Sequence, residues 1–238
     1  MSVTAEVVSL AVEIRRGDVL HFLDYPAGRT PPDRIDGLLT EVLPEARALA
    51  DARGTFVELP IGRAADVGLP PVAADALVLG LVTAGAALDA RVSELSREGE
   101  VTRALLLDAA GSAAAEEAAN LLGAMIVGDA ASEAPPEVSC RLSPGYGRWE
   151  VSAQPGVFAL LPHVELGVSL TPSFMMVPRK SISFAMWLGA RERITFGLGG
   201  CERCTLTRCR YRRAGAVRAS FQQHPVPSGP RHLQEGYR

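Results

Sequence analysis

The sequence predicts an α+β fold, a single domain in which helices flank a mixed or antiparallel central sheet. The chain has 238 residues, of which 47% are hydrophobic, and this is enough to bury one substantial core. Residues 76–84 form an apolar run of strand length, ended by Gly85. Residues 33–53 instead place apolar side chains at the three- and four-residue spacing of a helix. Strands and helices are therefore both expected.

Six stretches have the apolar patterning of strands. Residues 76–84 are expected to be a central buried strand, and residues 6–14, which alternate in part, a first strand. The other expected strands are residues 55–59, 167–170, 181–186 and 194–198.

Five stretches are expected to be helical. Asp33 can cap the helix over residues 33–53, and Pro44 inside it is expected to kink or interrupt it. Residues 100–127 are Ala-rich, and Gly111 and Ser112 in their middle would let another backbone approach closely. The remaining expected helices are residues 19–23, 86–98 and 152–161.

Composition excludes several classes of function. The formal net charge of −3 gives no indication of nucleic-acid binding, and no run approaches the roughly 18 to 20 apolar residues that span a bilayer. The N-terminus lacks a basic segment followed by an apolar one, so a cytoplasmic protein without a membrane role is expected. Residues 212–238 contain several Arg and Pro and little apolar periodicity, which predicts a basic, disordered tail after a domain of residues 1–211.

The hexapeptide Arg141-Leu-Ser-Pro-Gly-Tyr146 carries the first functional indication. An Arg fork grips a carboxylate through two parallel hydrogen bonds. Pro144 fixes φ and Gly145 tolerates a positive φ, so a tight exposed turn is expected, with backbone N–H and C=O groups free to face a ligand. Tyr146 adds an aromatic face for an adenine or a cation. A plain connecting loop with a surface Arg is the alternative for this hexapeptide alone.

A second motif follows about thirty residues later. Leu170-Thr-Pro-Ser-Phe-Met-Met-Val-Pro178 runs into Ser181 and Ser183. In this order and spacing, the two motifs resemble the S-adenosylmethionine-binding activation domain of cobalamin-dependent methionine synthase. The resemblance covers residues 140–199 best and does not extend to the tail. It implies a stand-alone version of one module of a larger enzyme, with the fold of that activation domain.

The resemblance also implies ligand contacts, position by position. Arg141 matches the arginine that binds the methionine carboxylate, Ser143 and Gly145 match positions giving backbone contacts, and Tyr146 matches the tyrosine of the motif. Thr171 matches the threonine-centred segment of the family. Thr195 and Phe196 align with an aromatic pair that contacts the ligand, although Thr195 itself is not aromatic. Glu117 or Glu116 matches a glutamate that the family carries on a helix. Pro172 replaces a glutamate, and Arg179 and Lys180 replace small residues, which implies a more basic pocket rim.

The cysteines form a separate pattern. Cys201, Cys204 and Cys209 are spaced C-x2-C-x4-C, which lets thiolates share a metal, and Cys140 is available as a fourth ligand. A zinc ion or an iron–sulfur cluster is one interpretation, and free thiols or adventitious disulfides are the others. Neighbouring Arg side chains would stabilise the thiolates.

The function implied by the resemblance is reactivation of a cobalamin protein by reductive methylation, with S-adenosylmethionine as methyl donor. The chain has no Asp-x-His-x-x-Gly cobalamin motif and no flavodoxin-like or Rossmann signature. The cobalamin is therefore expected on a separate methyltransferase or corrinoid protein, with electrons from an external low-potential donor. The chain would be an accessory subunit in methionine synthesis or related one-carbon transfer, in which positioning rather than acid–base catalysis is its role.

Two alternatives stay open at the level of sequence. One is a module that senses S-adenosylmethionine, or stabilises a corrinoid protein, without transferring a methyl group. The other is a metal-binding scaffold whose ligand pocket has decayed. The departures at Pro172 and Thr195 are compatible with both.

Overall fold

The structure is a computed structural model, and it describes residues 5–25, 29–69, 72–129, 138–139, 141–146 and 149–189. The expected strand over 194–198 and the expected tail over 212–238 lie outside these residues. The division into a domain and a tail therefore stays a prediction.

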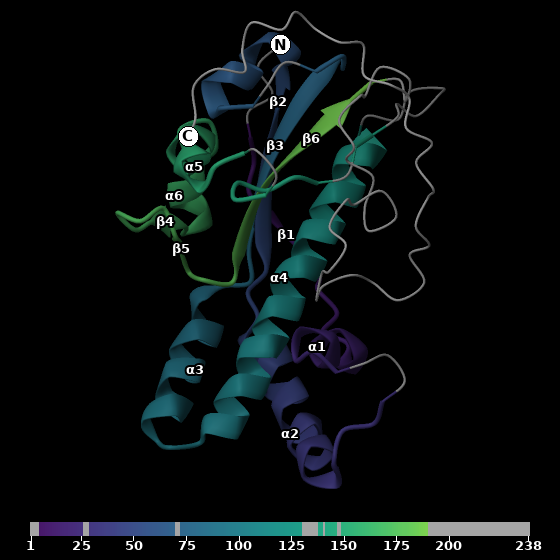
Figure 1. Cartoon of the computed structure of the whole chain (residues 1–238), viewed down its shortest axis with the longest axis vertical. Helices are drawn as coiled ribbons and strands as arrows, with labels where there is room; N and C mark the ends of the chain where they lie inside the picture. The colour runs from purple at the N-terminus through teal and green to yellow at the C-terminus, as the bar shows by residue number, and fades with distance from the viewer. Residues whose placement is uncertain are drawn as a thin grey trace, which may run out of the picture.

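A four-stranded antiparallel sheet forms the centre of the described molecule (Figure 1). Its order is β1-β2-β3-β6, and its strands are Val8–Ser9, Arg53–Pro60, Ala76–Thr83 and Ser181–Leu188. A separate hairpin pairs β4 (Ser169–Leu170) with β5 (Met176–Val177). The expected α+β class is confirmed, and every ladder is antiparallel within the described residues.

The central strand β3 is buried along its whole length, as its apolar sequence predicts. It pairs over eight residues with β2 on one side and with β6 on the other. Gly80 faces Phe184 across the β3–β6 ladder, and a Cβ at Gly80 would lie only 2.4 Å from the Phe184 ring. The ring therefore lies over the glycine backbone, and this fixes Phe184 on the sheet surface.

One face of the sheet is covered by the longest helix. This helix, α4 (Val101–Asp129), has 29 residues and is about 44 Å long at 1.5 Å per residue. Its side chains Ala118, Leu122 and Ile126 pack against Val82, Phe184 and Met186 of the strands. In Figure 1 it runs along the sheet and continues past it.

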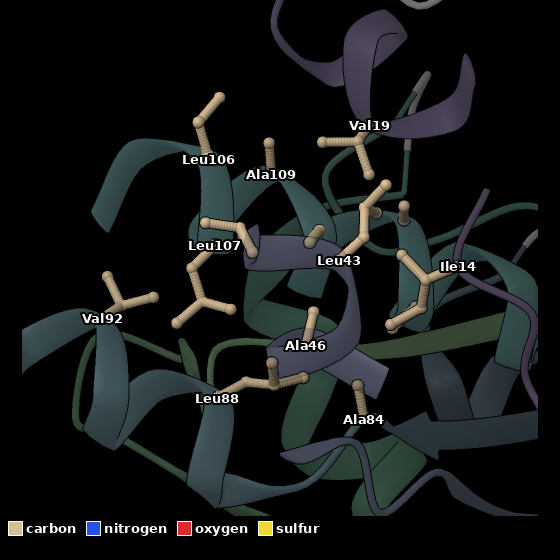
Figure 2. Packing of buried hydrophobic residues seen from close by; sticks show 14 of the residues in the cluster. Ile14, Val19, Leu43, Ala46, Ala84, Leu88, Val92, Leu106, Leu107 and Ala109 are labelled. Carbon is tan, nitrogen blue, oxygen red and sulfur yellow. The ribbon is translucent and has the colours of Figure 1, made fainter. Parts of the chain in front are cut away.

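Beyond the sheet, α4 packs against three other helices. These are α1 (Arg16–Phe22), α2 (Asp33–Leu49) and α3 (Ala86–Arg97). Figure 2 shows the core between them, in which Leu43 and Ala46 of α2 face Leu88 of α3 and Leu107 of α4. All four residues are buried, so this helical end of the molecule has its own apolar core.

Short helices cover the opposite sheet face. They are η1 (Ile61–Val67), η2 (Val151–Ala153), α5 (Gln154–Phe158) and α6 (His163–Leu166). Their core includes Trp149, Phe158 and Trp187. The sheet is thus a middle layer between α4 and these short helices.

Several predicted boundaries were wrong. The helix expected over 33–53 ends at Leu49, and Pro44 does not interrupt it. Only Val8 and Ser9 of residues 6–14 form strand, and the helix expected over 152–161 is a 3-10 turn followed by the five residues of α5. The space at Gly111 is occupied by the Lys180 side chain, whose Cγ would lie 3.1 Å from an added Cβ, and not by another backbone.

Candidate functional site

Arg141 lies at the edge of the sheet beside β6. The Leu142 N–H donates to the carbonyl oxygen of Ala185 at 2.9 Å, and the Ala185 N–H donates back to Leu142 at 2.7 Å. Leu142 packs on the face that carries the short helices. Because neighbouring residues of an extended chain point to opposite faces, the Arg141 side chain is directed toward α4.

The Arg141 guanidinium is held by two polar side chains of α4. Its Nη2 donates to Glu116 Oε1 at 2.6 Å and to Asn120 Oδ1 at 2.8 Å. Its Cζ lies 5.6 Å from the centre of the Phe184 ring, within the range of a cation–π contact. The side chain is 20% exposed, so the charge is partly removed from water and stays accessible from one side.

The turn after Arg141 has the geometry that its sequence predicts. The Tyr146 N–H donates to the Ser143 carbonyl at 3.1 Å, with Pro144 and Gly145 at the two central positions. Gly145 has φ +97°, as expected for a turn that requires a positive φ at its third residue. The expectation of free N–H groups was wrong in part, because the Gly145 N–H also donates within the chain, to the Trp149 carbonyl at 2.6 Å.

The far end of the turn is anchored in the core. Trp149 is 2% exposed, and its Nε1 donates to the Val67 carbonyl at 2.7 Å. Tyr146, by contrast, is 58% exposed. The turn is therefore fixed at both ends, by the Leu142 bridge and by Trp149, and it presents an aromatic ring to solvent.

Of the two candidate glutamates, the structure brings Glu116 and not Glu117 to Arg141. Glu117 lies on the other flank of α4, where its Oε1 is 3.9 Å from Arg15 Nη2. Its Oε2 accepts a hydrogen bond from Asn120 Nδ2 at 3.3 Å. The pKa of Arg15 is raised by its hydrogen bond to Glu13, with smaller contributions from the charges of Glu13 and Glu117. Glu117 thus reaches Arg141 only through Asn120.

Thr171 is placed away from Arg141. Its Oγ1 accepts the Met175 N–H at 3.1 Å and lies 3.0 Å from Ser173 Oγ, so it stabilises the turn of the β4–β5 hairpin. The flanking residues Leu170 and Met176 pack on the sheet face opposite α4. The structure therefore does not bring the two sequence motifs together at these residues, and a ligand role for Thr171 stays a prediction.

Arg179 and Lys180, which were expected to make the pocket rim more basic, both lie beside acidic side chains. Lys180 Nζ lies 2.8 Å from Asp108 Oδ1, and the Arg179 backbone N–H donates to Asp89 Oδ2 at 2.6 Å. Arg179 Nε is also 3.5 Å from Asp89 Oδ1. Each cation thus has an acidic partner on a neighbouring helix, and a more basic rim stays a prediction.

Other expected site residues lie outside the described part of the chain. They are Thr195, Phe196, Cys201, Cys204, Cys209 and the additional Cys140. Within the described residues, no cluster of His, Cys, Asp and Glu side chains is arranged to hold a metal ion. No helix among them is long and apolar enough to cross a membrane. The zinc or iron–sulfur interpretation thus stays a prediction.

Sequence reasoning missed Asn120 and Phe184. Glu116 and Asn120 are four residues apart in a stretch predicted to be helical, so their shared face was readable from the sequence. That this face meets Arg141 was not readable, because it depends on how α4 is rotated on the sheet. Phe184 was identified only as part of a strand.

These residues define an α+β domain with a partly buried Arg–Glu pair beside an exposed aromatic turn. No family model matches the chain, and no curated protein matches it in sequence. Among solved structures, the crystal structure of the MetH reactivation domain bound to AdoHcy matches with a TM-score of 0.56 and 16% sequence identity. The match covers 77% of this chain and 78% of that one. The chain therefore has the fold of the MetH reactivation domain, as the sequence motifs indicated.

Proposed function

We propose that this protein binds S-adenosylmethionine beside Arg141 and supplies its methyl group to the cobalamin of a separate protein. Arg141, held at the rim of a fold that binds AdoHcy in the MetH reactivation domain, is the observation that carries the proposal. S-adenosylhomocysteine is what remains of S-adenosylmethionine once the methyl group has left. A pocket for one therefore suits the other, apart from the methyl group and its positive charge.

The residues around Arg141 fit the amino-acid end of such a ligand. That end carries a carboxylate and an ammonium group on one carbon. Arg141 offers a guanidinium for the carboxylate, and Glu116, 2.6 Å from it, offers a carboxylate for the ammonium. An amino-acid zwitterion places its carboxylate beside Arg141 and its ammonium beside Glu116, so each ligand charge has a partner. A simple carboxylate has no ammonium group to pair with Glu116.

Tyr146 is the proposed contact for the adenine. Its ring is 58% exposed at the turn that Ser143 and Gly145 complete. An aromatic ring offers a stacking face to a planar base at little cost in side-chain entropy. The N–H groups of Gly145 and Tyr146 and the carbonyls of Ser143 and Tyr146 all bond within the chain. The Gly145 carbonyl is therefore the proposed backbone contact of this segment.

In the proposed reaction, the bond between sulfur and methyl carbon breaks and its electron pair stays on sulfur. The new cobalt–carbon bond takes its electron pair from cob(I)alamin, which an external donor forms from cob(II)alamin by adding one electron. The role of this chain is to orient the sulfonium methyl, since no side chain needs to move a proton. The corrinoid partner and the electron donor are parts of this proposal.

Calorimetric titration with S-adenosylmethionine and with S-adenosylhomocysteine tests the site. We expect one molecule of either ligand per chain, and Arg141→Ala to weaken binding roughly ten- to a hundred-fold, the effect of losing a charge-assisted contact. Arg141→Lys keeps the charge but loses the forked guanidinium, so its affinity should lie between those of the unaltered protein and Arg141→Ala. Arg91→Ala, at a partly exposed α3 arginine paired with Glu45 of α2, is the matched control and should leave affinity unchanged. Unchanged binding in Arg141→Ala would remove Arg141 from the site.

A further inference from the structure

Asn120 has an unusual position on α4, because it connects the two flanks of the helix. Its Oδ1 accepts from Arg141 Nη2 at 2.8 Å, and its Nδ2 donates to Glu117 Oε2 at 3.3 Å. Glu116 and Asn120 are one turn apart and both contact the same guanidinium nitrogen. The result is a continuous polar chain from Arg141 through Asn120 to Glu117.

The chemistry of the partners fixes the direction of the Asn120 amide. An ionised Glu117 only accepts hydrogen bonds, and an arginine only donates them. The NH2 group must therefore face Glu117, and the carbonyl oxygen must face Arg141. A reversed amide would place donor against donor and acceptor against acceptor, so Glu117 helps to keep the acceptor directed at Arg141.

Such a constraint matters for a long side chain. A free arginine side chain has many rotamers, and a ligand must overcome this entropy when it orders the side chain. Here Glu116 and Asn120 hold Nη2 from α4, and the Phe184 ring lies 5.6 Å from Cζ. The hydrogen bonds that the guanidinium makes to described residues all come from Nη2 and do not engage its Nε and Nη1 edge.

We infer that Asn120 is a positioning residue, which, together with Glu117, orients Arg141 for the carboxylate of an amino-acid ligand. The inference rests on the proposed function, because it gives Asn120 a role only toward a ligand that Arg141 binds. It assigns Glu117 an indirect role in place of the direct ligand contact expected from the sequence. Asn120 itself touches no reacting atom.

Two ligands that differ in one part separate positioning from folding. S-adenosylhomocysteine has the amino-acid group that Arg141 would bind, and 5′-methylthioadenosine has the same adenosine and sulfur without it. We expect Asn120→Ala to weaken S-adenosylhomocysteine binding about ten-fold, the effect of losing one hydrogen bond to a charged group. Binding of 5′-methylthioadenosine should stay within about two-fold, since that ligand does not use Arg141. Glu117→Ala should show the same selectivity with a smaller loss, because it frees the Asn120 amide without removing it.

The variants are chosen so that they fold. Alanine is a better helix former than asparagine, and Asn120 is partly exposed within α4. Ser112→Ala is the matched control: Ser112 lies two turns earlier on α4 and contacts Lys180 at 3.0 Å instead of Arg141. It should leave both affinities unchanged.

The outcomes are distinguishable. If the unaltered protein binds neither ligand, the proposed function fails and the role of Asn120 fails with it. If it binds S-adenosylhomocysteine and Asn120→Ala weakens both ligands equally, or weakens neither, the positioning role is overturned while the proposed function stands.

Discussion

At the scale of single residues, a row of hydroxyl groups is buried on the sheet face opposite α4. Thr55, Thr83, Ser181 and Ser183 lie on three neighbouring strands, and all are less than a tenth exposed. Ser183 Oγ donates to Gln154 Oε1 at 2.8 Å, and Ser181 Oγ donates to the Pro178 carbonyl at 2.8 Å. The first bond ties α5 to the sheet, and the second fixes the segment that enters β6.

Thr55 differs from the others, because its Oγ1 has no hydrogen-bond partner among the described residues although the residue is fully buried. An unpaired buried hydroxyl costs about 1 to 3 kcal/mol. Thr55→Val keeps the branched shape that suits a strand and removes this cost. We expect the free energy of unfolding to rise by about 1 kcal/mol, measured as a shift in the urea midpoint at constant slope.

Thr83→Val provides the opposite control. Thr83 is as deeply buried, but its Oγ1 accepts the Gly85 N–H at 3.1 Å and lies 3.0 Å from Ser181 Oγ. Its loss leaves buried partners unpaired and should destabilise by about 1 to 3 kcal/mol. If both variants moved the midpoint in the same direction, hydrogen bonding would not be what distinguishes the two sites.

At the scale of elements, Lys180 connects the start of β6 to the middle of α4. Its stem crosses Gly111, and its ammonium lies 2.8 Å from Asp108 Oδ1 and 3.0 Å from Ser112 Oγ. The lysine side chain is only 10% exposed, whereas that of Asp108 is 37% exposed. The nearly buried ammonium therefore needs its counter-ion more than the partly exposed carboxylate does.

This inequality predicts an asymmetric effect of substitution. Asp108→Asn leaves a nearly buried ammonium without its counter-ion and should cost about 2 to 3 kcal/mol, somewhat less than breaking a fully buried pair. Lys180→Met keeps the stem over Gly111 and leaves an aspartate that water can reach, so a loss of about 1 kcal/mol is expected. Urea unfolding of the two variants measures the difference. Equal losses, or a larger loss for Lys180→Met, would contradict this account of the pair.

The elements also show what the sequence could predict. The strand 76–84 and the helix 100–127 were located within two residues of β3 and α4, because long runs of strong pattern decide such elements locally. The predicted end of α2 was wrong. Residues 50–53 suit a helix, but Ala50 is extended and Arg53 pairs with Thr83. Pairing with β3 outweighs helix propensity there.

The sequence predicted which segment carries the site, but not which side chains contact Arg141. Arg141 and the positive φ of Gly145 followed from the residues of the turn. The choice between Glu116 and Glu117 did not, because adjacent residues on a helix point about 100° apart and sequence does not fix the rotation of α4. The contact between Asn120 and Arg141 likewise depends on which segment faces α4, and the sequence does not show this.

At the scale of the whole molecule, the site lies at the rim of the layered structure. Arg141 is on the outer side of β6, the strand at one end of the sheet, and the adjacent turn exposes Gly145 and Tyr146. In Figure 1 the sheet lies between α4 and the short helices. Because the Arg141 side chain is 20% exposed and Tyr146 is 58% exposed, the proposed function leads us to expect a ligand there to be within reach of a second protein.

Access at the rim leads to the expectation of methyl transfer between proteins. A corrin must bring its cobalt to within about 3 to 3.5 Å of the sulfonium methyl, which requires a site open on one side. We expect a single turnover of labelled methyl from S-adenosylmethionine to the cobalamin of a partner protein, only when a low-potential reductant is present. Tyr146→Ala should slow this transfer by more than it weakens S-adenosylmethionine binding, because we expect the partner to approach on the side of this exposed ring. Arg141→Ala should instead act through affinity, so that saturating S-adenosylmethionine restores part of the rate. If S-adenosylmethionine binds tightly but no label reaches any reduced corrinoid protein, the fold serves here to sense this ligand and not to donate its methyl group.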